Sequence, residues 1–143
     1  MYKVLLVEDD PVCSSSINKL LSEFCQIHIT SSAAIALNLA SANKYNLVMI
    51  DSNLHSGASG IGTANSIRNM SSYGFVPIVA FAITKLTESK EYLLSRGYTH
   101  LISEPFNIRN FAQQIKFILS SPLNVNDPVF MPAKKNSIPK LVY

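Results

Sequence analysis

Acidic side chains follow two apolar segments of this sequence. Glu8 and Asp9 come directly after the segment Lys3–Val7, and Asp51 closes the segment Asn46–Asp51. Short apolar segments that contain Val and Ile are typical of strands covered on both faces of a parallel sheet. Ligands of such sheets bind in a crevice outside the carboxyl ends of the strands. We therefore expect the three carboxylates to share one crevice if the two strands are neighbours.

Three converging carboxylates repel one another unless a pKa rises or a cation binds. Oxygen ligands that leave coordination positions open to water suit Mg²⁺, which is commonly held by one or two protein carboxylates together with phosphate oxygens. An Asp carboxylate beside such an ion can act as a nucleophile and form an acyl phosphate. The pattern therefore indicates phosphoryl chemistry at Asp51. The alternative is that Asp51 only begins the next loop, since Asp is a common turn residue.

Strand-like segments alternate with helical ones along the chain. The predicted strands are 3–7, 26–30, 46–51, 75–82 and 99–103. The predicted helices begin at Pro11, Ser31, Ile61, Thr84 and Asn107. This alternation predicts an α/β fold with a doubly wound parallel sheet.

Local signals place several of these elements. Asp10 is expected to cap the first helix. Apolar residues at helical spacing predict the buried face of that helix, namely Val12, Ile17, Leu20, Leu21 and Phe24. The fourth helix is expected to run from Thr84 to Ser95. His28 lies in an alternating segment typical of an edge strand, and we expect its side chain to point outward.

Length and composition favour one cytoplasmic domain. A chain of 143 residues with 48% apolar residues is long enough to bury a core without metals or disulfides. No apolar segment approaches the ~18 residues of a membrane span. The pattern of helices and strands ends near Ser120, and residues 121–143 form a Pro- and Lys-containing tail or linker.

Charge and cysteine content exclude further classes. The net charge of +3 is small and forms no basic stripe, so we expect no direct binding of nucleic acid. Cys13 and Cys25 fall near opposite ends of the first predicted helix, ~18 Å apart at ~1.5 Å per residue, which is too far for a disulfide. Both are therefore expected to be buried thiols.

Taken together, four features resemble the receiver domain of two-component response regulators. They are the segment Glu8–Val12, the isolated Asp51, the segment Val76–Ala80 and Glu104–Phe106. The resemblance covers residues 1–120. It implies a five-stranded, flavodoxin-like sheet in the order 2-1-3-4-5, in which the first and third strands are neighbours.

Site roles follow from the resemblance. It implies that Asp51 accepts a phosphoryl group, with Mg²⁺ as the cofactor, from a histidine kinase or a phosphotransfer protein. Asp9 corresponds to a direct metal ligand, Glu8 to a ligand through water, and Asn53 to the residue whose backbone carbonyl binds the metal. A downstream protein is expected to bind through the fourth and fifth helices, and no catalytic turnover of a separate substrate is expected.

The sequence departs from the family pattern at three switch positions. Ala82 stands where the family has Thr or Ser to bind the phosphoryl oxygen, and Leu101 stands where it has an aromatic residue. Glu104 replaces the lysine that pairs with the phosphoryl group. That exchange turns attraction into repulsion, worth about 4 kcal/mol at ~4 Å in an effective dielectric of ~20.

These departures leave two other functions open. One is a pseudo-receiver that binds proteins independently of phosphorylation. The other is a phosphatase of the haloacid dehalogenase type, which also uses an Asp at a strand end. Such phosphatases have a second acid two residues later as the general acid, whereas this chain has Asn53.

Overall fold

The structure is a computed structural model that describes residues 1–54, 59–82, 88–103, 108–121 and 123. Its strands are β1 (Tyr2–Val7), β2 (Cys25–Thr30), β3 (Leu47–Asp51), β4 (Ile78–Phe81) and β5 (His100–Ile102). All neighbouring strands pair in parallel, in the order β2-β1-β3-β4-β5. The predicted α/β fold and strand order are confirmed.

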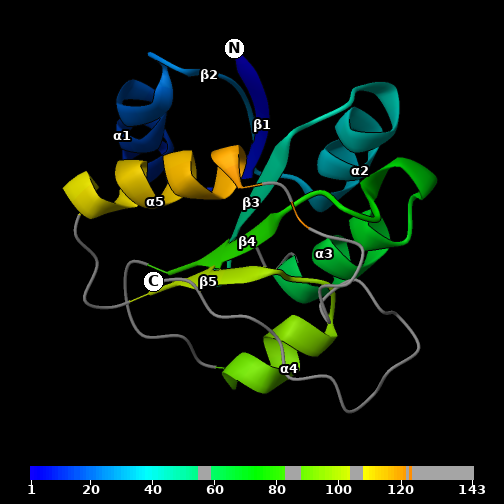
Figure 1. Ribbon diagram of the computed structural model, residues 1–143. Helices are drawn as coiled ribbons and strands as arrows, with labels where there is room; N and C mark the ends of the chain where they lie inside the picture. The colour runs from blue at the N-terminus through cyan, green and yellow to red at the C-terminus, as the bar shows by residue number, and fades with distance from the viewer. Residues whose placement is uncertain (55–58, 83–87, 104–107, 122, 124–143) are drawn as a thin grey trace.

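Helices cover both faces of this sheet (Figure 1). They are α1 (Pro11–Leu21), α2 (Ala33–Ala42), α3 (Gly60–Arg68), α4 (Lys90–Ser95) and α5 (Ile108–Ser120), with the 3₁₀ helix η1 (Ser71–Tyr73) after α3. Helices α1 and α5 lie on one face, and α2 and α3 lie on the other. The sheet is therefore the middle of three layers.

The side chains of β3 divide between two apolar cores. Val48 and Ile50 join the core on the side of α2 and α3, whereas Leu47 and Met49 join the core beneath α1 and α5. All of β3, including Asp51, is buried. Burying each Val, Leu or Ile side chain contributes about 1.5–3 kcal/mol. The expectation of a strand covered on both faces is confirmed. Burial of the apolar side chains holds β3 in place and so fixes the position of Asp51 at its end.

Side-chain caps fix where the helices begin. The Asp10 Oδ1 atom accepts a hydrogen bond from the Val12 amide at 3.0 Å, which confirms the predicted cap of α1. Ser32, Ser59 and Ser89 cap α2, α3 and α4 in the same way. Each cap supplies an acceptor for an amide that has no partner within the helix.

Some boundaries differ from those predicted. Helix α4 begins at Lys90 rather than Thr84, because Ser89 is its cap and Glu88 is not helical. Thr84 itself lies outside the described residues. Strand β4 is shorter than predicted, since it begins after Pro77, which lacks the amide hydrogen that a strand needs.

Two predicted side-chain environments, those of Val12 and His28, were wrong, and so was the predicted position of Cys25 in the first helix. Val12 is 75% exposed, because the buried face of α1 begins at Cys13. Cys25 begins β2 instead of ending α1, although both cysteines are buried and free as expected. His28 is half-buried, and its Nδ1 atom lies 2.6 Å from the Tyr45 hydroxyl oxygen.

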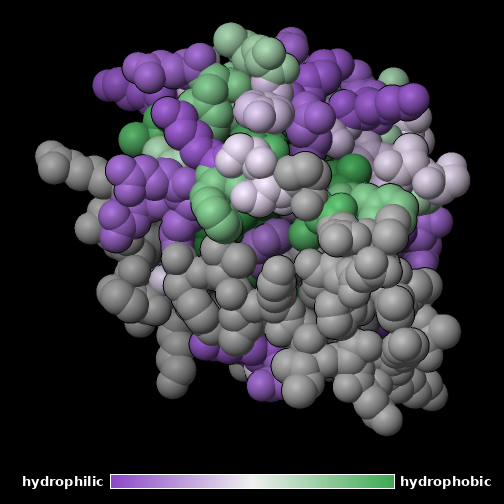
Figure 2. All heavy atoms as spheres, in the orientation of Figure 1, coloured by the Kyte–Doolittle hydropathy of each residue, from purple (hydrophilic) through white to green (hydrophobic). Residues whose placement is uncertain are grey.

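The described surface mixes polar and apolar residues. On the face drawn in Figure 2, hydrophilic and apolar residues alternate over the part of the chain that is coloured. Large exposed apolar side chains are spread over several elements; they include Val12, Ile35, Tyr92 and Phe117. Among the described residues, no helix combines the length and apolar character needed to cross a membrane.

Candidate functional site

Three carboxylates meet at the carboxyl ends of β1 and β3. Residues up to Val7 in β1 pair with residues up to Ile50 in β3, so the acids that follow them emerge side by side. Each of Glu8, Asp9 and Asp51 has a carboxylate oxygen within 4.8 Å of one from each of the other two. The structure therefore brings together the acids that the sequence placed at two separate strand ends.

Glu8 is a buried acid with one unsatisfied oxygen. Its Oε1 atom accepts a hydrogen bond from the Asp10 amide at 2.9 Å. Its Oε2 atom is buried and has no hydrogen-bond partner among the described residues. Burial is the larger cause, and a side-chain hydrogen bond with Asp51 the next, of the rise in the pKa of Glu8 from 4.5 to about 8. Binding of either a proton or a cation would therefore stabilise the buried Glu8 carboxylate.

Backbone contacts fix the position of Asp51. The Asn53 amide donates a hydrogen bond of 2.9 Å to the Asp51 Oδ1 atom. The next residue, Ser52, donates to the Phe81 carbonyl from its amide at 2.9 Å and from its hydroxyl at 3.1 Å. These bonds tie the end of β3 to β4. Asp51 thus presents a pre-oriented carboxylate that is only 8% exposed.

The arrangement fits a divalent cation. Three carboxylates provide the hard oxygen ligands that Mg²⁺ prefers, and the unsatisfied Oε2 atom of Glu8 is an acceptor without a donor in the described part of the chain. A bound cation would neutralise the repulsion among the acids. Asp9 is less buried than Glu8 and Asp51, so the site has one side toward solvent.

Cys13 is a buried thiol close to these acids. Cys13 is in the first turns of α1, and the negative charges of Glu8 and Asp51 act on it. Burial, together with these charges, raises the pKa of Cys13 to about 12. The thiol therefore stays protonated at neutral pH and is not a nucleophile.

The switch positions differ in how far the structure describes them. Ala82 and Leu101 are both fully buried, and Ala82 brings no hydroxyl to the end of β4. The Ala82 amide still donates to the Ile102 carbonyl at 2.9 Å, which continues the ladder to β5. Glu104 lies outside the described residues.

Tyr98 is a residue near the site that the sequence analysis missed. It is buried two residues before β5, and a Cβ atom built on Gly60 would meet both its hydroxyl oxygen and the Asp51 carbonyl oxygen. Its only sequence signal is an aromatic residue directly after Gly97, which ends the preceding turn with a positive φ of 110°. The nearness of Tyr98 to Asp51 depends on tertiary structure and leaves no trace in the sequence.

One protein family matches most of the chain. The profile of the family described as response regulator receiver domain matches residues 4–116. No curated protein sequence matches the chain.

Solved structures show the same fold. CheY4, a chemotaxis protein of Vibrio cholerae, is 22% identical with a TM-score of 0.74, over 82% of this chain and 98% of that one. The receiver domain of the sensor histidine kinase PA1611 from Pseudomonas aeruginosa PAO1 is 23% identical with a TM-score of 0.73, over 84% and 98%. That domain was solved with a magnesium ion coordinated in its active-site cleft. HP1043, an orphan response regulator of H. pylori, is 20% identical with a TM-score of 0.68, over 82% and 96%.

Proposed function

Because the chain belongs to the response regulator receiver domain family, we propose that Asp51 is its phosphoacceptor. The donor is a histidine kinase or a phosphotransfer protein. Mg²⁺ is held by the carboxylates of Asp9 and Asp51 and by the backbone carbonyl of Asn53. Glu8 acts on the ion through water.

The observation that carries this proposal is the convergence of three carboxylates, one of which, that of Glu8, has an oxygen without a hydrogen-bond partner among the described residues. One carboxylate oxygen from each of Glu8, Asp9 and Asp51 lies within 4.8 Å of the other two, and two of the three side chains are buried. Two buried acids this close are costly without a compensating charge. Once Glu8 loses its proton, as the pH rises through about 8, a neutral side chain at this position would cost the fold less.

Each residue has a definite role in phosphoryl transfer. The Asp51 oxygen forms a bond to phosphorus while the bond between phosphorus and the donor's histidine nitrogen breaks, and that nitrogen keeps the electron pair. The Asn53 amide orients the carboxylate through its 2.9 Å hydrogen bond. When bound, Mg²⁺ supplies positive charge that offsets repulsion between Asp51 and the phosphoryl oxygens. The product is an acyl phosphate on Asp51.

The output is proposed to be a protein contact through α4 and α5. Each helix exposes one large aromatic side chain, since Tyr92 in α4 is 45% exposed and Phe117 in α5 is 60% exposed. Exposed aromatic residues are frequent anchors of protein interfaces. These two side chains are therefore the first candidates for contact with a downstream partner.

One observation favours a second candidate function, a pseudo-receiver that binds its partner without phosphorylation. Ala82 is fully buried and has no hydroxyl to bind a phosphoryl oxygen. In that case the acidic site would serve only to bind a cation. The phosphatase alternative has no comparable support, since the match is to the receiver family.

Incubation with acetyl phosphate and Mg²⁺, followed by intact-protein mass spectrometry, separates the two candidates. A phosphoacceptor gains one phosphoryl group, and hydroxylamine removes it because acyl phosphates are labile to this nucleophile. The Asp51→Asn variant should gain none. An unmodified wild-type protein would favour the pseudo-receiver, and modification that persists in the variant would exclude Asp51 as the acceptor.

A further inference from the structure

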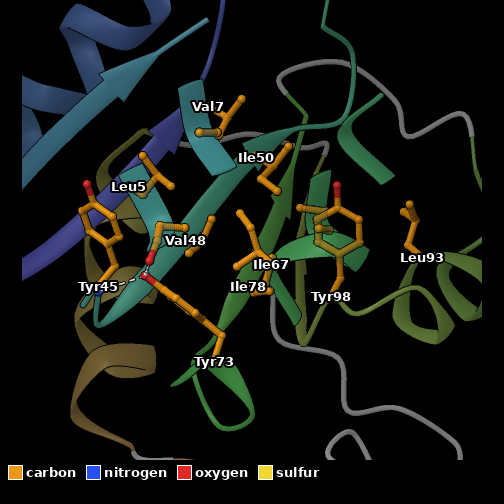
Figure 3. Close-up of a cluster of buried hydrophobic side chains, with 14 of the residues drawn as sticks. Leu5, Val7, Tyr45, Val48, Ile50, Ile67, Tyr73, Ile78, Leu93 and Tyr98 are labelled. Carbon is orange, nitrogen blue, oxygen red and sulfur yellow. Dashed lines mark hydrogen bonds between the residues drawn. The ribbon is translucent and has the colours of Figure 1, made fainter. Parts of the chain in front are cut away.

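Tyr98 carries a buried hydroxyl group that the structure leaves unsatisfied. The residue is 1% exposed and lies in the apolar core that contains Ile50 and Leu93 (Figure 3). Its hydroxyl oxygen has no hydrogen-bond partner among the described residues. A buried polar group without a partner costs free energy, so it favours any alternative arrangement that provides one.

The Tyr98 hydroxyl lies beside Gly60, the first residue of α3. A Cβ atom built on Gly60 would stand 3.3 Å from the Tyr98 hydroxyl oxygen and 3.3 Å from the Asp51 carbonyl oxygen. The Tyr98 hydroxyl and the Asp51 carbonyl thus both lie next to the position that a Gly60 side chain would occupy. Both burial and the charge of Asp51 raise the pKa of Tyr98. The hydroxyl is therefore a neutral donor near an acceptor that it does not yet reach.

Another buried tyrosine shows that this fold does satisfy such groups. Tyr73 is also 1% exposed, and its hydroxyl donates to the carbonyl oxygens of Ala40 at 2.8 Å and Asn43 at 2.9 Å. Figure 3 shows the Tyr73 hydroxyl pointing toward Tyr45, with its contact drawn. The unsatisfied hydroxyl of Tyr98 is thus a local feature of the region beside Asp51.

We propose that Tyr98 is a positioning residue that couples the state of Asp51 to the start of α3. In the liganded protein the backbone of Asp51 and Gly60 shifts, so that the Tyr98 hydroxyl donates to the Asp51 carbonyl oxygen. This inference rests on the proposed function, because it needs a ligand at Asp51. It assigns a coupling role to a residue outside the switch positions Ala82 and Leu101.

The Tyr98 hydroxyl should favour the liganded state over the unliganded one. A ligand shifts an equilibrium only through interactions that differ between the two states. The hydroxyl is unpaired without ligand and paired with it, so it contributes to that difference. Removing the hydroxyl should therefore stabilise the unliganded protein and weaken ligand binding.

The test compares two Tyr-to-Phe variants with beryllium fluoride and Mg²⁺ as the probe of the phosphorylated state. Tyr98→Phe should raise the Tm of the free protein and weaken beryllium fluoride binding about tenfold, which corresponds to ~1.4 kcal/mol. Tyr73→Phe should lower the Tm and leave the affinity unchanged, because its hydroxyl is already satisfied. In NMR spectra the probe should shift the Gly60 amide resonance of the wild type, and the shift should be smaller in Tyr98→Phe.

The outcomes separate this inference from the proposed function. If wild type binds the probe and Asp51→Asn does not, the proposed function stands. Unchanged affinity and an unchanged Gly60 shift in Tyr98→Phe would then overturn the coupling alone. A Tyr98→Phe variant that loses stability or does not fold would also overturn it, since the hydroxyl would already have a partner. A wild-type protein that does not bind the probe overturns both.

Discussion

The carboxylates of Glu8 and Asp51 come within 4.8 Å of each other although both side chains are buried. Glu8 follows β1 and Asp51 ends the neighbouring strand β3, so their positions are fixed by the sheet and not by a flexible connection. Holding the two carboxylates this close therefore costs folding free energy, and the cost depends on whether a proton or a cation is bound. This dependence can be measured in several ways.

The stability of the metal-free protein should depend on the proton of Glu8. Its pKa is raised from 4.5 to about 8 in the folded state, so folding binds this proton more tightly. The stability that Glu8 contributes is fully present below pH 4.5 and is lost as the pH rises through about 8. Urea denaturation in EDTA between about pH 5 and pH 9 should show a falling contribution from Glu8.

Glu8→Gln isolates that contribution. Gln is similar in size to Glu and stays neutral, so the metal-free variant should be more stable than wild type at high pH. The difference in unfolding free energy between the two proteins should shrink as the pH falls toward 5. A difference that stays constant with pH would show that the Glu8 carboxyl group keeps its ordinary pKa in the fold.

Neutralising Asp9 should weaken Mg²⁺ binding more than neutralising Asp10. Asp9 belongs to the carboxylate cluster, whereas Asp10 caps α1 through Val12, and Asn also caps helices well. We expect Asp9→Asn to reduce the affinity by about tenfold or more, or ~1.4 kcal/mol. Calorimetric titration of both variants with Mg²⁺ checks this. Equal losses would indicate a general effect of charge instead of direct ligation by Asp9.

Gly97 should not tolerate a side chain. Its φ is 110°, and an added Cβ would lie 3.1 Å from the Arg68 Cβ and 3.3 Å from the Ala64 carbonyl oxygen. Gly97→Ala should cost about 1–3 kcal/mol of unfolding free energy. Gly74→Ala is the matched control, because its Cβ would meet no atom within 4 Å and its φ is −60°. That variant should be neutral or gain up to about 1 kcal/mol.

The contact between Gly60 and Tyr98 should appear in a double-mutant cycle. Gly60→Ala places a Cβ 3.3 Å from the Tyr98 hydroxyl oxygen, and Tyr98→Phe removes that oxygen. The cost of Gly60→Ala should therefore be smaller by about 0.5–1 kcal/mol in the Tyr98→Phe background. Gly62→Ala, whose Cβ would contact Ser59, should cost the same in both backgrounds. Strict additivity for Gly60 would exclude the contact.

The strands and the acids at their ends could be predicted because their signals are local. The apolar composition of Leu47–Ile50 is typical of a strand buried on both faces, as β3 is, and Asp51 stands at its end. The strand order came from resemblance and not from periodicity. It is the order that made Glu8 and Asp51 neighbours.

Other features depended on tertiary contacts or on competing local signals. Val12 fits the helical spacing of α1 but lies outside its buried face. Ser89 caps α4, so this helix begins at Lys90 and not at Thr84 as predicted. Tyr98 meets Gly60 and Asp51, which are distant in the sequence, so no pattern around it could indicate that contact.

Anomalous diffraction from crystals grown with Mn²⁺ in place of Mg²⁺ would show whether the three carboxylates hold a divalent cation. We expect one strong peak bound by the carboxylates of Asp9 and Asp51 and by the Asn53 carbonyl oxygen, and no such peak in Asp51→Asn. A wild-type crystal saturated with Mn²⁺ that shows no peak between Asp9 and Asp51 would contradict this expectation.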